Sequence, residues 1–264
     1  MARQGFKNII SFKTIDSTNR YLLDQATRGA PEGTVVVSEH QTSGRGRLDR
    51  RWEAEPGTCL LASVLVRPVI SQVDLHFCTT AIALSALDGC RAVCGVEPAI
   101  KWPNDLVVRD RKLAGILAES DPTAPGGKNG SIAVVIGMGL NVSWPGPPEA
   151  GGTSVLAEMK DNDGSGDEIL ESATGEITRQ LLDALLDAFE PRVVKLQTPA
   201  GRNSLLQEHR ANCVTLGRRV RVELANGFVE GDAVGISDSG CLVVESSGRR
   251  IEVASGDVVH VRPS

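Results

Sequence analysis

The chain has 264 residues, 41% of them hydrophobic, with a formal net charge of -5 and a sequence pI near 5.5. A chain of this length can bury a large core, and we expect one large domain and one small one. The acidic balance argues against nucleic acid or an anionic membrane as the main partner, because neutralising phosphates requires a basic face.

No targeting or membrane-spanning segment is predicted. The stretch MARQGFKNIISFKT lacks the apolar core of a signal peptide, and the longest apolar runs, near 60–66 and 132–140, are too short to cross a bilayer. We therefore expect a cytoplasmic protein. The six cysteines are scattered through apolar segments, which indicates buried thiols, and no second Cys or His pair accompanies Cys90 and Cys94 to make a zinc site.

The first part of the chain predicts two helices and two strands. Asp16-Ser17-Thr18-Asn19 offers N-cap side chains to a short helix that ends at Gly29. Apolar residues at three- and four-residue spacing predict a long buried helix over Asp74 to Cys94. Strands are predicted over 34–38 and 59–66, joined by a loop that contains Gly44-Arg45-Gly46-Arg47.

The middle of the chain predicts an antiparallel meander of three strands, over 99–108, 113–119 and 131–140. The first two turn through Arg109-Asp110, and the glycine- and proline-rich segment DPTAPGGKNG joins the last two. Beyond the meander, one apolar stripe predicts a helix over Asp167 to Phe189, and a second helix is expected near Pro199 to Ala211.

From about Val214 the pattern changes to short alternating strands, which predict a small all-β barrel. The turns fall at Asn226-Gly227, Asp238-Ser-Gly240 and Ser247-Gly248. We place the domain boundary near residue 212, with a catalytic domain over 1–212 and a small barrel over 213–264. The expected fold class is α+β, with a mixed, largely antiparallel sheet and helices in the large domain.

An arginine-rich loop is the most unusual segment. Gln41-Thr-Ser-Gly44-Arg45-Gly46-Arg47, followed by Arg50, Arg51 and Trp52, places four arginines within seven residues of an acidic protein. Glycine backbone N–H groups and bidentate arginines suit a phosphate or a carboxylate. A solvated basic loop is the alternative, and composition alone leaves the two open.

Three further segments carry polar residues in apolar surroundings. Lys101-Trp102-Pro103-Asn104-Asp105 interrupts a strand, either as a simple turn or for function. Lys112 begins KLAGIL, where strand alternation predicts the same face as Ala114 and Ile116, as an edge charge or as an ammonium aimed into a pocket. The glycines of GMGLN, at 137–141, allow a ligand or another chain to approach the backbone.

Together these segments resemble the biotin protein ligase family. The resemblance rests on STN at 17–19, QTSGRGR at 41–47 with Trp52, KWPND at 101–105, KLAGIL at 112–117, GMGLN at 137–141 and the C-terminal small barrel, in the family's order. It spans nearly the whole chain. It implies the biotin–lipoyl ligase fold, similar to class II synthetases, with an SH3-like C-terminal β-barrel.

The resemblance implies an enzyme that forms biotinyl-5′-AMP from biotin and ATP and transfers biotin to a lysine of a carrier domain. One anion attacks another in the first step, so Arg45, Arg47 and Lys112 are implied catalytic cations. Asp105 is implied as a magnesium ligand or as an acceptor of the lysine proton, and its division of roles with Asn104 stays open. The implied biotin site comprises Ser17, Thr18, Asn19, Gln41, Gly44, Arg45, Gly46, Arg47, Lys112, Gly115 and Leu117. The implied ATP and adenylate site comprises Arg47, Arg50, Trp52, Asn104, Lys112, Asn141, Thr153 and Ser154.

ATP and biotin are the implied substrates, with Mg²⁺ and without a permanently bound cofactor. The implied partner is the biotin carboxyl carrier domain of an acyl-CoA or pyruvate carboxylase, with no nucleic acid and no membrane, and the protein is expected to be a monomer or a homodimer. Some family members carry an N-terminal DNA-binding domain, for which STN at residue 17 leaves no room, so a ligase alone is expected.

One residue departs from the family's pattern, and two other functions remain open. Asp49 stands where members commonly have glycine, which subtracts charge from the arginine cluster and stiffens the loop. The first alternative is a lipoyl or octanoyl protein ligase of the same fold, whose acyl ligand lacks a ureido head. The second is a biotin-binding protein without catalysis.

Overall fold

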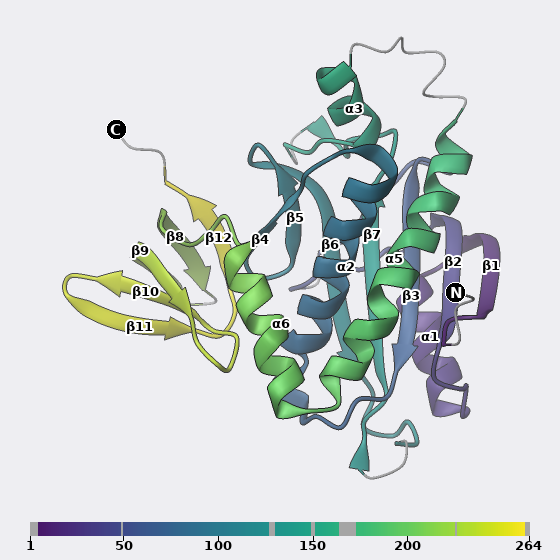
Figure 1. The fold of residues 1–264 in the computed structure, drawn as a ribbon, viewed down its shortest axis with the longest axis horizontal. Coiled ribbons are helices and arrows are strands. Elements are labelled where there is room, and N and C mark those ends of the chain that lie inside the picture. Colours follow the sequence, from purple (N-terminus) through teal and green to yellow (C-terminus); the bar gives the residue numbers. More distant parts are fainter. Residues whose placement is uncertain are drawn as a thin grey trace.

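The computed structural model of the chain describes residues 5–48, 50–126, 130–148, 151–163, 173–224 and 226–261. Its strands form two sheets, with seven strands in the order β1-β2-β3-β7-β6-β5-β4 and five in the order β11-β10-β9-β8-β12 (Figure 1). The smaller sheet lies beside the β4 edge of the larger one, where Ile100 and Cys213 form a β-bridge. The departure at Asp49 lies outside the described residues.

The large sheet is mixed and largely antiparallel, as predicted. Its strands are β1 (Asn8–Ile15), β2 (Thr34–Gln41), β3 (Cys59–Val66), β4 (Ala99–Lys101), β5 (Asp105–Val108), β6 (Arg111–Ser120) and β7 (Val134–Asn141). Among the described strand pairs of this sheet, only β1 and β2 run parallel.

Two strand predictions differ from the structure. The single strand expected over 99–108 is a hairpin of β4 and β5, because Trp102, Pro103 and Asn104 form the turn between them. Proline has no backbone N–H to donate to a strand ladder, which favours a turn at this position. Edge strand β1 was not predicted, and much of it is exposed, so its sequence shows little of the apolar run that marks a buried strand.

The two faces of the large sheet have different partners. Alternate residues of β3 and β7, including Leu60, Val64, Ile136 and Leu140, belong to the main core, with helices α2 (His76–Cys94), α5 (Thr174–Leu196) and α6 (Pro199–Ala211), which cover the front in Figure 1. The opposite face packs on helix α1 (Thr18–Thr27). Because α1 covers only part of that face, the remaining part is available to a ligand.

The predicted start of α1 and end of α2 are confirmed, whereas α2 begins at His76 rather than at Asp74. Ser17 caps α1, since its side chain accepts a hydrogen bond from the backbone N–H of Arg20, and α2 ends at left-handed Gly95. The segment Gln72–Cys94, which joins the 3-10 turn η1 (Gln72–Asp74) to α2, is long and apolar enough to cross a membrane. Because 67% of its apolar window is buried inside the fold, we interpret it as a core helix.

The later helices required two corrections. Helix α5 continues through Pro191 to Leu196 rather than ending at Phe189, and the predicted start at Asp167 lies outside the described residues. Helix α3 (Val155–Asp163) was not predicted. The second predicted helix, α6, has the expected bounds.

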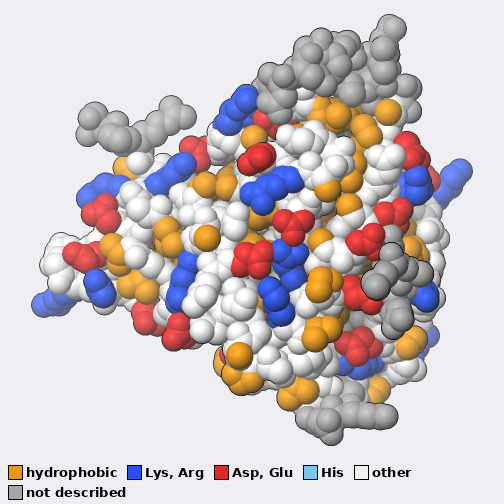
Figure 2. Space-filling view, in the orientation of Figure 1, with side chains coloured by type: hydrophobic (Ala, Val, Ile, Leu, Met, Phe, Trp, Pro, Cys, Tyr) orange, Lys and Arg blue, Asp and Glu red, His pale blue; other side chains and the backbone are white. Residues whose placement is uncertain are grey.

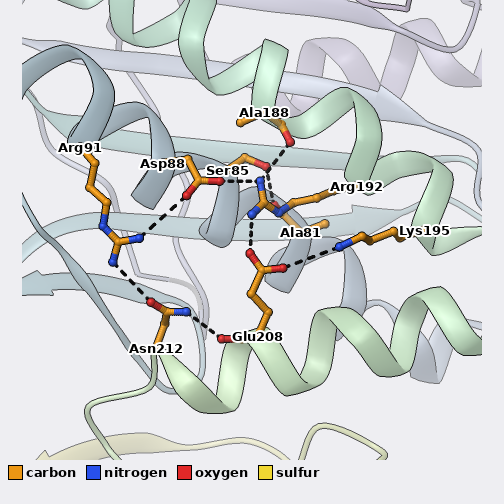
Figure 3. A network of polar contacts seen from close by, with 9 residues as sticks. All are labelled: Ala81, Ser85, Asp88, Arg91, Ala188, Arg192, Lys195, Glu208 and Asn212. Atoms are coloured by element: carbon orange, nitrogen blue, oxygen red, sulfur yellow. Dashed lines mark hydrogen bonds and ion pairs between the residues drawn. The ribbon is translucent and has the colours of Figure 1, made fainter.

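A buried arginine ties the front helices together (Figure 3). Arg192 of α5 donates to Asp88 of α2 at 2.8 Å and to Glu208 of α6 at 2.5 Å. Its side chain is 11% exposed, so these ion pairs are shielded from water more than the surface charges that intersperse this face in Figure 2. One side chain thereby fixes three helices relative to one another.

The small sheet contains β8 (Arg219–Leu224), β9 (Gly227–Ile236), β10 (Leu242–Ser246), β11 (Arg249–Val253) and β12 (Asp257–His260). Its turns lie where the sequence predicts them. The described strand pairs leave β11 and β12 as open edges, so they do not close the expected barrel. Four of the five residues of β11 are exposed, which leaves it little apolar surface with which to fold back toward β12.

Candidate active site

A cavity of about 120 Å³ lies on the α1 side of the large sheet. Residues from six separate segments of the chain line it: Ser17, Thr18, Asn19, Gln41, Arg45, Gly46, Arg47, Arg50, Arg51, Trp52, Asn104, Asp105, Lys112, Gly115, Ile116, Leu117, Gly137, Met138, Gly139 and Asp257. Fold and sequence motifs therefore converge on one place. Of the predicted biotin-site residues only Gly44 is absent from this lining, and it lines another hollow beside the same loop.

Three glycines form the floor of the cavity. Gly115 of β6 pairs with Gly139 of β7, and Gly137 pairs with Leu117 in the next row. A β-carbon on Gly139 would lie 2.3 Å from a ring carbon of Trp52, and one on Gly137 would lie 2.0 Å from Asn19 Oδ1. The strand glycines are therefore required because other side chains occupy the space above the backbone.

One end of the cavity, the polar pocket, is formed by buried Ser17, Thr18, Asn19 and Ser63 and by partly buried Gln41. Hydrogen bonds join all of these except Ser17 into one network. Gln41 Oε1 accepts from the Thr18 backbone N–H at 2.8 Å and from Thr18 Oγ1 at 3.0 Å. Ser63 Oγ lies 2.8 Å from Thr18 Oγ1 and 2.6 Å from Asn19 Oδ1. The polar residues are preorganised to bind a ligand that has both donors and acceptors.

The arginine loop, residues 44–52, reaches three different elements. Arg45 pairs with Glu119 of β6 at 2.9 Å between Nη2 and Oε1. Arg47 donates to Asn104 Oδ1 at 3.1 Å, and Arg50 pairs with Asp257 of β12. An anionic ligand in the cavity must therefore compete with protein acceptors for these guanidinium groups.

One of these arginines is partly removed from water. Removal from water lowers the pKa of the Arg47 guanidinium, whereas the nearby carboxylates of Asp257 and Asp105 act in the opposite direction. A cation that is partly stripped of water gains more from an anionic partner than a solvated one does.

Lys112 points into the cavity, and strand alternation predicted its face wrongly. The pairing of β5 with β6 shifts register between Leu106 and Val107, so that Leu106 faces Ala114 and Val107 faces Lys112. Such a bulge reverses the face of the following residues. The Lys112 ammonium lies 2.8 Å from Asp105 Oδ1 and 3.4 Å from the position of a β-carbon on Gly115.

The turn KWPND divides its polar groups between two tasks. Both polar atoms of the Asn104 side chain are hydrogen-bonded within the protein. Nδ2 donates to the Ile116 carbonyl at 2.8 Å, and Oδ1 accepts from Arg47. Asp105 instead faces Lys112 in the cavity. The two neighbours therefore have different surroundings.

Trp52 separates the first cavity from a second one of about 370 Å³, which Lys112, Asn141, Pro145 and Gly152 also line. The indole Nε1 of Trp52 is buried without a hydrogen-bond partner among the described residues. Buried donors are normally satisfied, so this N–H is available to a ligand.

Asn141 lines this second cavity, whereas Thr153 and Ser154, which were also predicted for ATP, do not. Asn141 Nδ2 donates to the carbonyls of Pro145 at 3.1 Å and Thr153 at 2.9 Å. Thr153 and Ser154 are buried and line neither of the two cavities, and the Ser154 side chain accepts from the Ala157 N–H at the start of α3. The structure therefore brings Asn141 to the cavity wall and holds Thr153 and Ser154 as its support.

The charges of the first cavity favour an anion. Five basic side chains line it against two acidic ones, Asp105 and Asp257. Within the described residues no group of three or more His, Cys, Asp or Glu side chains could hold a metal ion. Two carboxylates fit a magnesium ion that arrives with a nucleotide and keeps water and phosphate ligands, rather than a protein-only metal cage.

Three residues of the site were missed by sequence reasoning. Ser63 lies in the apolar run CLLASVLV and is fully buried, so it could have been noticed as a polar residue that needs a partner. Glu119 follows the KLAGIL segment on the same strand face as Gly115 and Leu117. Asp257 carries no local signal, because its place depends on how the small sheet packs.

Comparison with known proteins identifies two matching family models. The first, the biotin/lipoate A/B protein ligase family, matches residues 11–141. The second, the biotin protein ligase C terminal domain, matches residues 215–261.

Individual relatives cover almost the whole chain. It is 36% identical to a biotin--[acetyl-CoA-carboxylase] ligase of Mycobacterium tuberculosis, over 99% of this chain and 92% of that protein. It is 30% identical to the bifunctional ligase/repressor BirA of Bacillus subtilis, over 96% of this chain and 74% of that protein. The fold is similar to that of the biotin protein ligase from Aquifex aeolicus in complex with biotin and ATP, with a TM-score of 0.76, 24% identity and coverage of 98% of this chain and 100% of that one.

Proposed function

Because this chain belongs to the biotin protein ligase family, we propose that it forms biotinyl-5′-AMP from biotin and ATP and transfers biotin to a lysine of a carboxylase carrier domain. The observation that carries the proposal is the single cavity in which a polar pocket, a glycine floor and five cations meet. The polar pocket suits a carboxylic acid with a polar head, and the cations suit its carboxylate and the phosphates of a nucleoside triphosphate.

In the first half-reaction a biotin carboxylate oxygen attacks the α-phosphorus of ATP and pyrophosphate leaves. Two anions approach each other, so the barrier falls when cations surround the reacting oxygens. Arg45, Arg47 and Lys112 supply this charge from the wall of the cavity. Arg47 and Lys112 also bind the adenylate phosphate after pyrophosphate has left.

The ureido head of biotin occupies the polar pocket. Its N–H groups donate to side-chain oxygens of the pocket, which Ser17, Thr18 and Asn19 supply, and its carbonyl accepts from the pocket donors. A ureido group buried without such partners would cost affinity. The ring and tail pack beside Gly115 and Leu117, which line the cavity next to the Trp52 ring.

The nucleotide extends past Trp52 toward the second cavity. The indole covers the adenine, and Asn141 and Gly152 line the space around the base. Arg50 reaches the phosphates from the loop, and buried Thr153 and Ser154 hold the surrounding segment. Asn104 positions Arg47 through their 3.1 Å hydrogen bond.

In the second half-reaction the amine of the carrier lysine attacks the acyl carbon of biotinyl-AMP and AMP leaves. The amine must lose a proton, and we assign Asp105 as its acceptor because its carboxylate lies in the cavity. Magnesium, when bound with the nucleotide, neutralises phosphate charge, and Asp105 and Asp257 are the carboxylates that would hold it.

We further propose a catalytic unit over 1–212 and a C-terminal unit over 213–264. The division is supported by the two sheets and by the two family models on either side of residue 212. The partner is a biotin carboxyl carrier domain of an acyl-CoA or pyruvate carboxylase. We propose a cytoplasmic location, with which the six free cysteines are consistent. We also propose a monomer or a homodimer with no nucleic acid or membrane partner.

The test is pyrophosphate release in the presence of ATP and magnesium with biotin, with lipoate or with neither acid. We expect pyrophosphate release in the reaction with biotin and not in the other two. A carrier domain added afterwards should be labelled on one lysine. Release with lipoate and not with biotin would favour the lipoyl ligase function. Biotin binding without pyrophosphate release would favour a binding protein without catalysis.

A pair of matched variants places the reaction in the cavity. Gly139→Ala puts a β-carbon into the Trp52 ring and is expected to abolish pyrophosphate release, whereas Gly235→Ala, in strand β9, meets no atom within 4 Å and should leave the rate unchanged. Equal rates in both variants would contradict the location.

A further inference from the structure

The carboxylate of Glu119 contacts both the polar pocket and the arginine loop. Its Oε2 accepts from Asn19 Nδ2 at 2.8 Å, and its Oε1 pairs with Arg45 Nη2 at 2.9 Å. Each oxygen thus serves a different part of the cavity. Glu119 itself is absent from the cavity lining, so it acts through its two partners.

Glu119 also fixes the orientation of the Asn19 amide. The Asn19 Nδ2 group donates one hydrogen to the Leu117 carbonyl at 3.2 Å and the other to Glu119, so both of its hydrogens are used. The oxygen Oδ1 therefore faces Ser63 Oγ, 2.6 Å away, above the bare backbone of Gly137. Asn19 is left with one acceptor lone pair for a ligand, which suits an N–H donor.

The Glu119–Arg45 pair is sensitive to what fills the cavity. The Glu119 side chain is 19% exposed and that of Arg45 is 46% exposed, so water screens the pair when the pocket is empty. A ligand in the pocket excludes that water and lowers the local dielectric, which strengthens the ion pair. A donor to Asn19 Oδ1 also polarises the amide toward Glu119.

We propose that Glu119 is a positioning residue that couples ligand binding in the polar pocket to the position of the arginine loop. The inference rests on the proposed function, since it takes biotin as the occupant of the pocket and ATP as the ligand of the loop. Coupling between two sites is reciprocal, so biotin and nucleotide each raise the affinity for the other by the same factor.

The experiment measures the Kd of biotin by calorimetry, with and without α,β-methylene-ATP, which cannot release pyrophosphate by adenylate formation. In the wild type we expect the nucleotide to tighten biotin binding by about fivefold or more. In Glu119→Gln the amide oxygen still accepts from Asn19, but the charge for Arg45 is lost. We therefore expect the coupling factor to fall to about one, while the Kd of biotin alone changes by no more than roughly twofold.

Glu230→Gln is the matched control, because Glu230 of β9 also pairs with an arginine, Arg219, at 3.0 Å but lies outside the cavity lining. It should keep the wild-type coupling factor. A wild-type factor in Glu119→Gln, even with a lowered Tm or active fraction, would overturn the inference by showing a purely structural role.

The outcomes separate this inference from the proposed function. If the wild type does not bind biotin, the proposed function fails. If the wild type binds biotin and nucleotide without coupling, or Glu119→Gln couples them fully, the function stands and the role of Glu119 fails.

Discussion

Replacing Lys112 by alanine is expected to remove the first half-reaction and to leave the fold intact. The ammonium lies 2.8 Å from Asp105 Oδ1 and 5.6 Å from the centre of the Trp52 ring, in the wall shared by both cavities. The Lys112 side chain is 37% exposed, so its ion pair contributes at most about 1 kcal/mol to stability. Losing a preorganised charge beside the reacting phosphate raises the barrier by about 3 kcal/mol, which slows adenylate formation about a hundred- to a thousandfold.

The assay is pyrophosphate release at saturating biotin and MgATP, with urea unfolding as the measure of stability. Lys195→Ala is the control, because Lys195 of α5 is 41% exposed and lies 3.8 Å from Glu208, yet lines neither cavity. We expect the control to react at the wild-type rate. A Lys112→Ala rate close to that of the wild type would refute the catalytic role and leave Lys112 as an edge charge.

Three further predictions concern the loop, the small sheet and pH. Arg47→Gly should weaken retention of biotinyl-AMP more than its formation, so that bystander proteins become biotinylated; labelling confined to the carrier domain would contradict this. Arg50→Ala and Asp257→Ala should each raise the KM for ATP, and the double variant should raise it by less than the product of the two single effects, because the pair joins the loop to the small sheet; fully multiplicative effects would exclude the ion pair as the cause. Burial lowers the pKa of His209 to about 4 from 6.5, so stability is lost as pH falls from about 6.5 toward 4. Between pH 7.5 and pH 5 this contributes about 2 kcal/mol of destabilisation, and His209→Asn should lack that part of the loss in urea unfolding.

The sequence predicted the elements that carry their own boundary signals. Ser17 and Gly29 bracket α1, and the apolar run of β3 has the predicted bounds. Where the apolar stripe stopped before the helix did, the prediction failed. Helix α5 continues beyond the predicted end at Phe189, since Leu196 is buried in the main core and Arg192 is held by ion pairs.

The residues of the candidate site were predicted more completely than their geometry. The motifs name most of the cavity lining, because each departs from the apolar pattern of its strand. The face of Lys112 could not be predicted, since a shift in the pairing of β5 with β6 decides it. Asp257 could not be predicted either, because contacts between the two sheets are set by tertiary packing and not by any local pattern.

The glycine floor has a consequence for anyone who engineers this protein. Glycine inside a strand is less stable than larger residues by roughly 0.5–1 kcal/mol, so at Gly137 and Gly139 strand stability is given up to make room for the Asn19 and Trp52 side chains above the backbone. A directed-evolution library screened for heat resistance alone is therefore expected to keep these glycines, because a β-carbon there would lie within 2.3 Å of Asn19 or Trp52. A larger residue at either position requires a second substitution at Asn19 or Trp52, and both of these line the cavity.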